Sequence, residues 1–469
     1  MCTTVLVGKK ASRTGSTMIA RNADAEEPIQ PVKFIHVKAD QNGKGTYRST
    51  VSEYQETYPE HSLAYHMIPF IESERKELGI MGEAGINSLN IAMSSTESIF
   101  GNPFVLAIDP LTKRGLGEDS LLNMVLPYIH SAREGVTYTA KIIAEYGSHE
   151  GNGIIFSDKD EIWYMEIPCG HHWVAVRLPD DCCAVIANQS LIEEVDFTDT
   201  QNVMYSEGIQ EFVATNHLNP DYEGFNFRHI FGTSSKEDRK YNTARVWYGQ
   251  KYLGLDTTDP TASDMPFCFK PNRLLTVADV GAVLSSHYDE TCYDPFNETD
   301  QIHAKMYRPI AMNRTAESHI LEIRNHVPAE IAALFWLNSG PTAFNPYVPF
   351  YTNSEDTAPA YHKTSKTYDN TQAYWLSREL AVLVERDYQK LSYANFDYLT
   401  AAAILANQCV AETDRLYQEK PTTDPVAFLT KQNQQNADKM LTLTKKHIGE
   451  LIEKGLALSK LTFDITKDV

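Results

Sequence analysis

Several features that define common protein classes are missing from this sequence of 469 residues. No apolar stretch is long enough to span a membrane, and the opening MCTTVLVGKKASRTGS lacks the charged start and apolar core of a secretory signal. Positive charge is scarce, because 42 Lys and Arg face 62 Asp and Glu, for a formal net charge of −20. Such a charge repels phosphate backbones and anionic lipid, so we expect neither nucleic acid nor a membrane as a partner.

The motifs of several enzyme classes are absent as well. The sequence contains no HExxH, no GxGxxG after a strand, no P-loop and no GxSxG. The one tight histidine pair, His171–His172, lies on an expected strand, where neighbouring side chains point to opposite faces. We therefore expect one of the two to face solvent and the other to pack, and we expect no metal and no cofactor.

Cysteines are few and scattered, without a CxxC pair or a disulfide-rich spacing. This usage is typical of a reducing compartment, and we predict a cytoplasmic location. The seven cysteines are Cys2, Cys169, Cys182, Cys183, Cys268, Cys292 and Cys409.

The residues that are present predict a folded chain of the α+β class. Hydrophobic residues make up 42% and aromatic residues 10%, enough for a substantial core. A helix is expected over about 120–145, with Asp119 as its cap and Pro127 as a kink or break. Further helices are expected over 372–417 and 434–459. Strands are expected at 3–7, 17–20, 32–37, 90–94, 154–156, 162–167, 173–178 and 183–187.

We interpret this pattern as one elaborated domain over 2–469. It comprises a strand-rich half at 2–200, insertions and loops at 221–307, and a mainly helical remainder at 318–469. A separate C-terminal helical domain is the alternative. The order of strands, a helix, strands and then helices favours layers of sheet and helix. Chain size also makes a homo-oligomer an expected state.

Cys2 is the cysteine whose position suggests chemistry. It follows the initiator Met, and loss of Met1 would give Cys2 an α-amine of its own. The reference pKa of such an amine is about 7.7–8.0 and that of the thiol about 8.5, so the amine is suited to act as base for its own thiol. The alternative is a cysteine that merely begins a strand.

Two charged residues end the next expected strand, in the run Arg21-Asn22-Ala23-Asp24. Antiparallel pairing of the first two strands would bring Arg21 and Asp24 beside Cys2. A guanidinium there stabilises a thiolate, and a carboxylate holds the amine in position. A surface Arg and Asp in a turn is the alternative.

These motifs resemble the start of the N-terminal-nucleophile hydrolases of the choloylglycine hydrolase and penicillin acylase type. More closely, the chain resembles the cysteine dipeptidases of the dipeptidase A family, which are related to the secernins. The resemblance extends along the chain and is clearest over residues 1–200. It is carried by MCTT and ARNAD, by MGEAGINSLNIAMSSTES at 81–98, EYGSHEGNGIIFSDKDEIWYMEI at 145–167 and GHHWVAVRLPDDCCAVIANQS at 170–190.

The resemblance implies roles for five residues. Cys2 is the nucleophile, with Arg21 and Asp24 as its supporting pair. Asn188 donates to the oxyanion, and Arg245 lies near the active centre. Each of the last two has a structural alternative, a strand-end cap for Asn188 and an ion-pair partner for Arg245. The region of Asn90 and Thr96–Glu97 departs from the choloylglycine hydrolase pattern, so no second oxyanion donor is identified.

The implied fold is an αββα four-layer sandwich with additional C-terminal helices. The implied activity is hydrolysis of dipeptides by the Cys2 thiol. Two alternatives remain at this point. One keeps the chemistry but acts on acyl-amine bonds of the bile-salt or penicillin type, and the other is a non-catalytic, secernin-like binding protein.

Overall fold

A computed structural model describes residues 2–40, 45–71, 81–95, 99–419 and 422–459. Its centre is formed by two antiparallel sheets, and a small two-stranded sheet pairs β4 (Thr46–Arg48) with β5 (Gln55–Thr57). The first sheet has the order β14 (Cys268–Phe269), β12 (Cys183–Ile186), β1 (Thr3–Val7), β2 (Thr17–Asp24), β15 (Thr315–Ile323), β16 (Ala333–Asn338), β17 (Val348–Tyr351). The second has the order β13 (Val203–Tyr205), β11 (Val174–Arg177), β10 (Ile162–Ile167), β9 (Asn152–Ser157), β8 (Ala92–Ser95), β7 (Gly82–Asn87), β6 (Tyr65–Pro69), β3 (Ile35–Val37).

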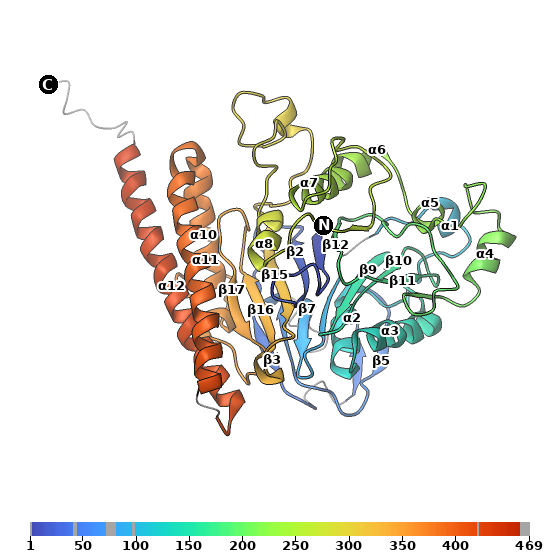
Figure 1. The fold of residues 1–469 in the computed structure, drawn as a ribbon, viewed down its shortest axis with the longest axis horizontal. Coiled ribbons are helices and arrows are strands. Elements are labelled where there is room, and N and C mark those ends of the chain that lie inside the picture. The colour runs from blue at the N-terminus through green and yellow to red at the C-terminus, as the bar shows by residue number, and fades with distance from the viewer. Residues whose placement is uncertain (1, 41–44, 72–80, 96–98, 420–421, 460–469) are drawn as a thin grey trace.

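The helices form layers outside these sheets (Figure 1). α2 (Glu118–Val125) and α3 (Ala132–Tyr146) pack on the second sheet, and α7 (Ala244–Tyr252) and α8 (Val277–Leu284) pack on the first. The two sheets contact each other through β2, β8 and β9. The expected αββα sandwich is therefore confirmed.

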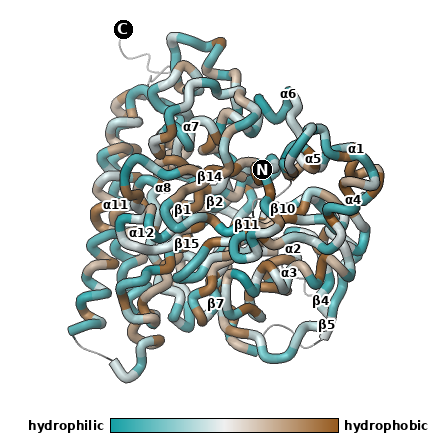
Figure 2. Tube along the Cα trace, turned by 45° about the vertical axis from the view of Figure 1, so that its right-hand side comes forward, coloured by the Kyte–Doolittle hydropathy of each residue, from teal (hydrophilic) through white to brown (hydrophobic). Residues whose placement is uncertain are grey.

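Three longer helices close the β17 side of the first sheet, and they confirm the expected C-terminal helices (Figure 1). They are α10 (Ala373–Arg386), α11 (Tyr388–Glu419) and α12 (Pro425–Leu458). In Figure 2, α11 and α12 alternate between hydrophobic and hydrophilic segments, as expected of helices that bury one side. Shorter helices are α1 (Pro103–Leu106), α4 (Ile209–Thr215), α5 (Phe227–Phe231), α6 (Lys236–Asp238) and α9 (Pro359–His362).

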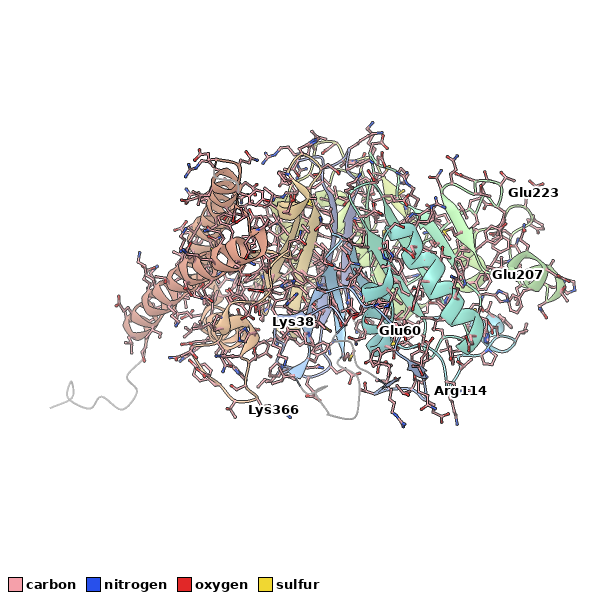
Figure 3. The ribbon with its side chains drawn as sticks, turned by 90° about the horizontal axis from the view of Figure 1, so that it is seen from below. Lys38, Glu60, Arg114, Glu207, Glu223 and Lys366 are labelled. Carbon is pink, nitrogen blue, oxygen red and sulfur yellow. The ribbon has the colours of Figure 1, made fainter. Side chains whose placement is uncertain are left out.

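Charged side chains lie at the periphery, including Lys38, Glu60, Arg114, Glu207, Glu223 and Lys366, which Figure 3 labels. Among the described residues, no helix is both long and apolar enough to cross a membrane.

The expected helix over 120–145 differs from the structure at its start. α2 begins at Glu118 after Gly117, so the expectation that Asp119 caps the helix is wrong. The Asp119 carboxylate instead accepts hydrogen bonds from Ser49 Oγ and Thr50 N at 3.0 and 2.5 Å, which fixes the loop after β4. The break at Pro127 is confirmed, because a short 3₁₀ turn separates α2 from α3.

Sequence analysis predicted no strand between 315 and 351, where the structure has β15, β16 and β17. Every residue of these three strands is buried. β16 (ALFWLN) and β17 (VPFY) are largely apolar runs, which are hard to distinguish from a buried helix, whereas β15 (TAESHILEI) buries several polar residues. These strands complete the side of the first sheet that lies beyond β2.

Candidate active site around Cys2

Cys2 lies immediately before β1, at the centre of the first sheet. β1 pairs with β12 in a register that sets Thr4 opposite Ile186, and this brings Cys2 beside Asn188, two residues beyond the end of β12. Cys2 N donates a hydrogen bond of 2.9 Å to Asn188 Oδ1. Only 1% of Cys2 is exposed. Two neighbouring strands thus position the cysteine and the asparagine.

Arg21 reaches Cys2 from β2, the other neighbour of β1. It is paired with Thr4, so its side chain lies on the same face of the sheet as that of Cys2. Arg21 Nη2 lies 3.0 Å from Cys2 Sγ. The same nitrogen donates to the carboxylates of Glu83 and, at 3.2 Å, Glu118. One guanidinium nitrogen therefore joins the sulfur to two acidic side chains.

These charges determine the protonation of Arg21. Burial by itself lowers the pKa of a guanidinium, but the negative charges at Cys2, Glu83 and Glu118 outweigh it and raise the pKa of Arg21 well above its usual value. Arg21 is fully buried and stays cationic. A permanent positive charge in hydrogen-bond contact with Sγ favours the thiolate.

Arg245 approaches Cys2 from α7. Its Nη1 donates to the carbonyl oxygen of Cys2 and, at 2.8 Å, to Thr3 Oγ1. Its Nη2 donates to Asn188 Oδ1 at 3.0 Å and to Asn242 Oδ1 at 2.8 Å. Because a guanidinium can only donate, these contacts require the oxygen of the Asn188 amide to face Arg245 and Cys2 N.

No carboxylate contacts the Arg245 guanidinium among the hydrogen bonds and ion pairs of the described residues. Burial, reinforced by repulsion from Arg308, lowers the pKa of Arg245 to about 9, and the charges of Tyr288, Asp24 and Cys2 oppose this shift. The side chain is fully buried and still charged at neutral pH. Its guanidinium donates hydrogen bonds to Cys2, Thr3 and Asn188 and so holds these three residues together.

Asp24 occupies a different face from Arg21. The two residues are three apart on β2, and side chains alternate along a strand, so they project to opposite sides of the sheet. The Asp24 carboxylate accepts hydrogen bonds from Arg308 Nη2 and from Thr315 Oγ1, the latter at 2.5 Å. The structure thus joins Cys2, Arg21, Asn188 and Arg245 directly, and Asp24 interacts with this set electrostatically through Arg245.

Sequence reasoning missed Glu83, Glu118 and Asn242. Glu83 lies within the otherwise uncharged GEAGIN strand, and Glu118 lies at the start of a helix whose eight residues are all buried. An acidic residue inside a buried element was the available signal. Thr96 and Glu97 lie outside the described residues. Asn90 lies in the turn between β7 and β8, and its Nδ2 donates a hydrogen bond of 2.9 Å to the carbonyl oxygen of Ala329.

The histidine pair precedes β11 and does not lie on a strand as expected, although one ring faces solvent and the other packs. His171 is half-exposed and lies 2.8 Å from the Asp109 carboxylate. His172 packs its ring on Phe212 and contacts Ser206 Oγ at 3.0 Å. No group of three or more possible metal-ligating side chains occurs in the part of the chain that the structure describes.

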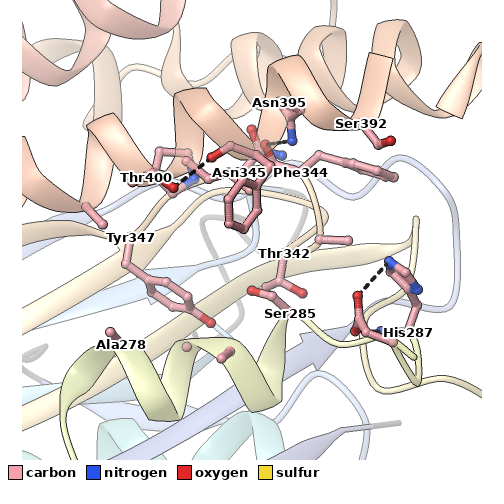
Figure 4. A pocket seen from close by; sticks show the side chains of 18 of the residues that line it. Ala278, Ser285, His287, Thr342, Phe344, Asn345, Tyr347, Ser392, Asn395 and Thr400 are labelled. Atoms are coloured by element: carbon pink, nitrogen blue, oxygen red, sulfur yellow. Dashed lines mark hydrogen bonds and ion pairs between the residues drawn. The ribbon is translucent and has the colours of Figure 1, made fainter. Parts of the chain in front are cut away.

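Two cavities lie near this region. One, of about 500 Å³, borders the active-site network through Asn242 and is lined by Phe100, Gly101, Thr233, Ser235, Glu237, Asp238, Tyr241 and Asn242. The other, of about 640 Å³, lies between α8 and α11 and contains none of the five expected site residues. Figure 4 shows Ser285, Tyr347 and Asn395 around it. Asn242, which contacts Arg245, links the first cavity to the residues around Cys2.

Comparisons with known proteins report which sequences and which solved structure this chain is similar to. The sequence model described as "Peptidase family C69" matches residues 1–400. A probable dipeptidase of Latilactobacillus sakei is 46% identical over 469 residues, covering 100% of this chain and 98% of that protein. Dipeptidase A of Lactobacillus helveticus is 38% identical over 472 residues, covering 99% and 98%. A penicillin V acylase structure from Agrobacterium tumefaciens aligns over 74% of this chain and 86% of that one, with 12% identity and a TM-score of 0.32.

Proposed function

The chain belongs to peptidase family C69, and on that premise we propose that it is a cysteine dipeptidase whose nucleophile is the Cys2 thiol. Full-length relatives at 38–46% identity carry the name dipeptidase, which supports the substrate class. The observation that carries the assignment of Cys2 is the pair of contacts at its two reactive atoms. Sγ lies 3.0 Å from Arg21 Nη2, and N lies 2.9 Å from Asn188 Oδ1.

In the proposed reaction, removal of Met1 leaves Cys2 with an α-amine that takes the proton of its own thiol. Arg21 stabilises the resulting thiolate, which attacks the carbonyl carbon of the dipeptide. Asn188 orients the amine through Oδ1, and we assign its amide nitrogen, together with backbone N–H groups, to the oxyanion. Arg245 holds Asn188 and the Cys2 carbonyl in this arrangement.

The second half of the reaction reverses the proton transfer. The ammonium of Cys2 protonates the leaving amine, the C–N bond breaks, and a thioester to Sγ remains. Water then attacks the thioester carbonyl and gives its proton to the α-amine; the C–S bond breaks, the first amino acid leaves with its carboxyl group free, and the proton returns to Sγ. Asp24 contributes to this scheme through the charge that it presents to Arg308 and Arg245.

An intact mass and a dipeptide panel test the proposal. Wild-type protein should lack Met1 and cleave dipeptides, and Cys2→Ala should cleave none. Full activity in Cys2→Ala, or in protein that retains Met1, would contradict the mechanism. Cleavage of acylated amines or of longer peptides, without cleavage of dipeptides, would contradict only the substrate class.

We further propose a cytoplasmic location and self-association. All seven cysteines lie in the described part of the chain and none forms a disulfide, which suits a reducing compartment. Tyr393, Phe396 and Ile404 on α11 are exposed by 82%, 68% and 55%, an apolar surface of the kind that supports a homo-oligomer. Light scattering on the purified protein measures the oligomeric state.

A further inference from the structure

We propose that Glu83 and Glu118 bind the α-ammonium group of the substrate and so restrict the enzyme to peptides with an unmodified amino terminus. This inference rests on the proposed function, because it names the part of a dipeptide that these carboxylates recognise. It follows from the position of the carboxylates, from their charge and from the unused donors of Arg21.

The position of the carboxylates matches the chemistry of a dipeptide. Glu83 and Glu118 each contact Arg21 Nη2, and the same nitrogen contacts Cys2 Sγ at 3.0 Å. Each carboxylate is thus separated from the sulfur by a single guanidinium nitrogen. In a dipeptide, a single carbon atom separates the α-ammonium from the carbonyl carbon that the sulfur attacks. An ammonium on that carbon therefore arrives in the immediate neighbourhood of these two acids.

The charge of the cluster favours a cationic ligand group. Glu83 and Glu118 bring two negative charges, Arg21 brings one positive charge, and the exposed fractions of the three residues are 8%, 4% and 0%. Carboxylates in such a place attract a cationic group of a ligand. The ammonium of a dipeptide is such a group, and the substrate excludes water as it binds.

Glu118 is held in place to meet such a ligand. Its Oε1 accepts hydrogen bonds from Ser95 Oγ at 2.9 Å and from Arg21 at 3.2 Å. Its backbone N–H donates to Glu150 Oε1 at 2.7 Å, which fixes the start of α2. A carboxylate held by two donors on a fixed helix start binds a ligand without losing much further freedom.

Arg21 provides a second, independent indication of a ligand. Its Nε and Nη1 are buried and have no hydrogen-bond partner among the described residues. Buried donors without an acceptor are costly, so this group is completed by a ligand that brings oxygen atoms. A dipeptide has one amide carbonyl, on the carbon next to the one that bears the ammonium, so its ammonium meets the acids while the arginine donors share that carbonyl oxygen with Asn188.

The test compares one dipeptide with its desamino analogue, in which hydrogen replaces the α-ammonium. Wild-type enzyme should show kcat/KM for the dipeptide at least about 100-fold above that for the analogue, the usual effect of removing one partner of a buried charge pair. Glu118→Gln and Glu83→Gln should each lower this ratio at least about tenfold. The ratio does not depend on the concentration of folded enzyme, so partial misfolding of a variant does not affect it.

Glu237→Gln serves as the matched control, because Glu237 lines the neighbouring cavity of about 500 Å³. Its ratio should equal that of wild type. Equal losses for both substrates in Glu118→Gln and Glu83→Gln would mean that the acids only position Arg21, and would overturn the inference. A lowered ratio in Glu237→Gln would overturn the inference, because it would show that the ammonium is bound in the neighbouring cavity.

The wild-type enzyme alone also decides the matter. Equal cleavage of the dipeptide and its desamino analogue would overturn this inference and leave the dipeptidase proposal intact. Absence of any dipeptide cleavage would overturn both.

Discussion

Arg21 and Arg245 are both buried and both contact Cys2, but their partners differ in kind. Arg21 meets the sulfur and two carboxylates, and its pKa is raised. Arg245 meets carbonyl, hydroxyl and amide oxygens, and burial lowers its pKa to about 9. The Arg21 side therefore concentrates charge at Cys2 Sγ, whereas the Arg245 side fixes the positions of the Cys2 backbone and of Asn188.

Replacement of the arginines should give the largest difference between the two sides. Arg21→Met leaves two buried carboxylates without their cation, so we expect the free energy of unfolding to fall by about 3–5 kcal/mol. We also expect kcat/KM to fall by about 100-fold to 1000-fold in the folded fraction, because the thiolate loses its adjacent charge.

Arg245→Met is the matched comparison for this variant. It leaves only neutral acceptors behind, so its loss of stability should be smaller. Denaturant unfolding of both variants and active-site titration measure these effects. An equal or larger loss of stability in Arg245→Met would contradict the division between the two sides.

The next largest effect is the pH dependence of stability that comes from Glu166 on β10, which lies on the Arg245 side. Glu166 Oε1 accepts from the N–H groups of Leu191 and Ile192 at 2.7 and 3.3 Å, and so holds the segment that follows Asn188. Burial raises the pKa of Glu166 from 4.5 to about 7, although its hydrogen bonds oppose the shift. Between these two values the unfolded chain ionises first, so stability falls as the pH rises, by about 3 kcal/mol in total.

Glu166→Gln should remove this part of the pH dependence. Its free energy of unfolding, measured between pH 4 and pH 8, should decline less than that of wild type. Glu134→Gln, a change at a partly exposed carboxylate, should leave the dependence as it is in wild type. If the free energy of unfolding depends on pH in Glu166→Gln as it does in wild type, then ionisation of the Glu166 carboxylate does not destabilise the folded chain.

A third variant introduces a carboxylate on the Arg245 side, so that both arginines have a negatively charged partner. Asn188→Asp keeps the acceptor for Cys2 N and Arg245 but adds a negative charge. That charge favours the ammonium form of the Cys2 terminus, so less of the amine is available as base. We expect kcat/KM at pH 7 to fall at least about tenfold and to recover at higher pH. A rate that is reduced equally at every pH would instead indicate loss of the oxyanion donor alone.

The smallest expected effect comes from two neighbouring threonines on β1. Thr3 Oγ1 accepts from Arg245 at 2.8 Å, whereas the buried Thr4 Oγ1 has no hydrogen-bond partner in the described part of the chain. Thr3→Val should cost about 1 kcal/mol of unfolding free energy. Thr4→Val, of the same shape, should be neutral or stabilising. Equal costs for the two changes would mean that the Thr3–Arg245 contact contributes nothing.

Much of the active centre was predictable from local sequence. Cys2, a β-branched strand, a turn and a second strand that contains Arg21 form a hairpin, and the hairpin register alone brings Arg21 to the thiol. The pattern also predicted most strands of the first two hundred residues and the helices near the C-terminus. It failed for β16 and β17, since short apolar runs do not distinguish buried strands from buried helices, and for β15, which contains polar residues that only the tertiary structure buries.

The sequence by itself determined that Cys2 and Arg21 meet, because both lie in one short hairpin with local contacts. Only the tertiary structure decided which acids and amides surround them. Glu83, Glu118, Asn242 and Arg308 come from separate elements, and their contacts with Arg21, Arg245 and Asp24 depend on how two sheets and a helix pack. The side to which Asp24 projects was decided by strand alternation, which sets it opposite Arg21 across the sheet.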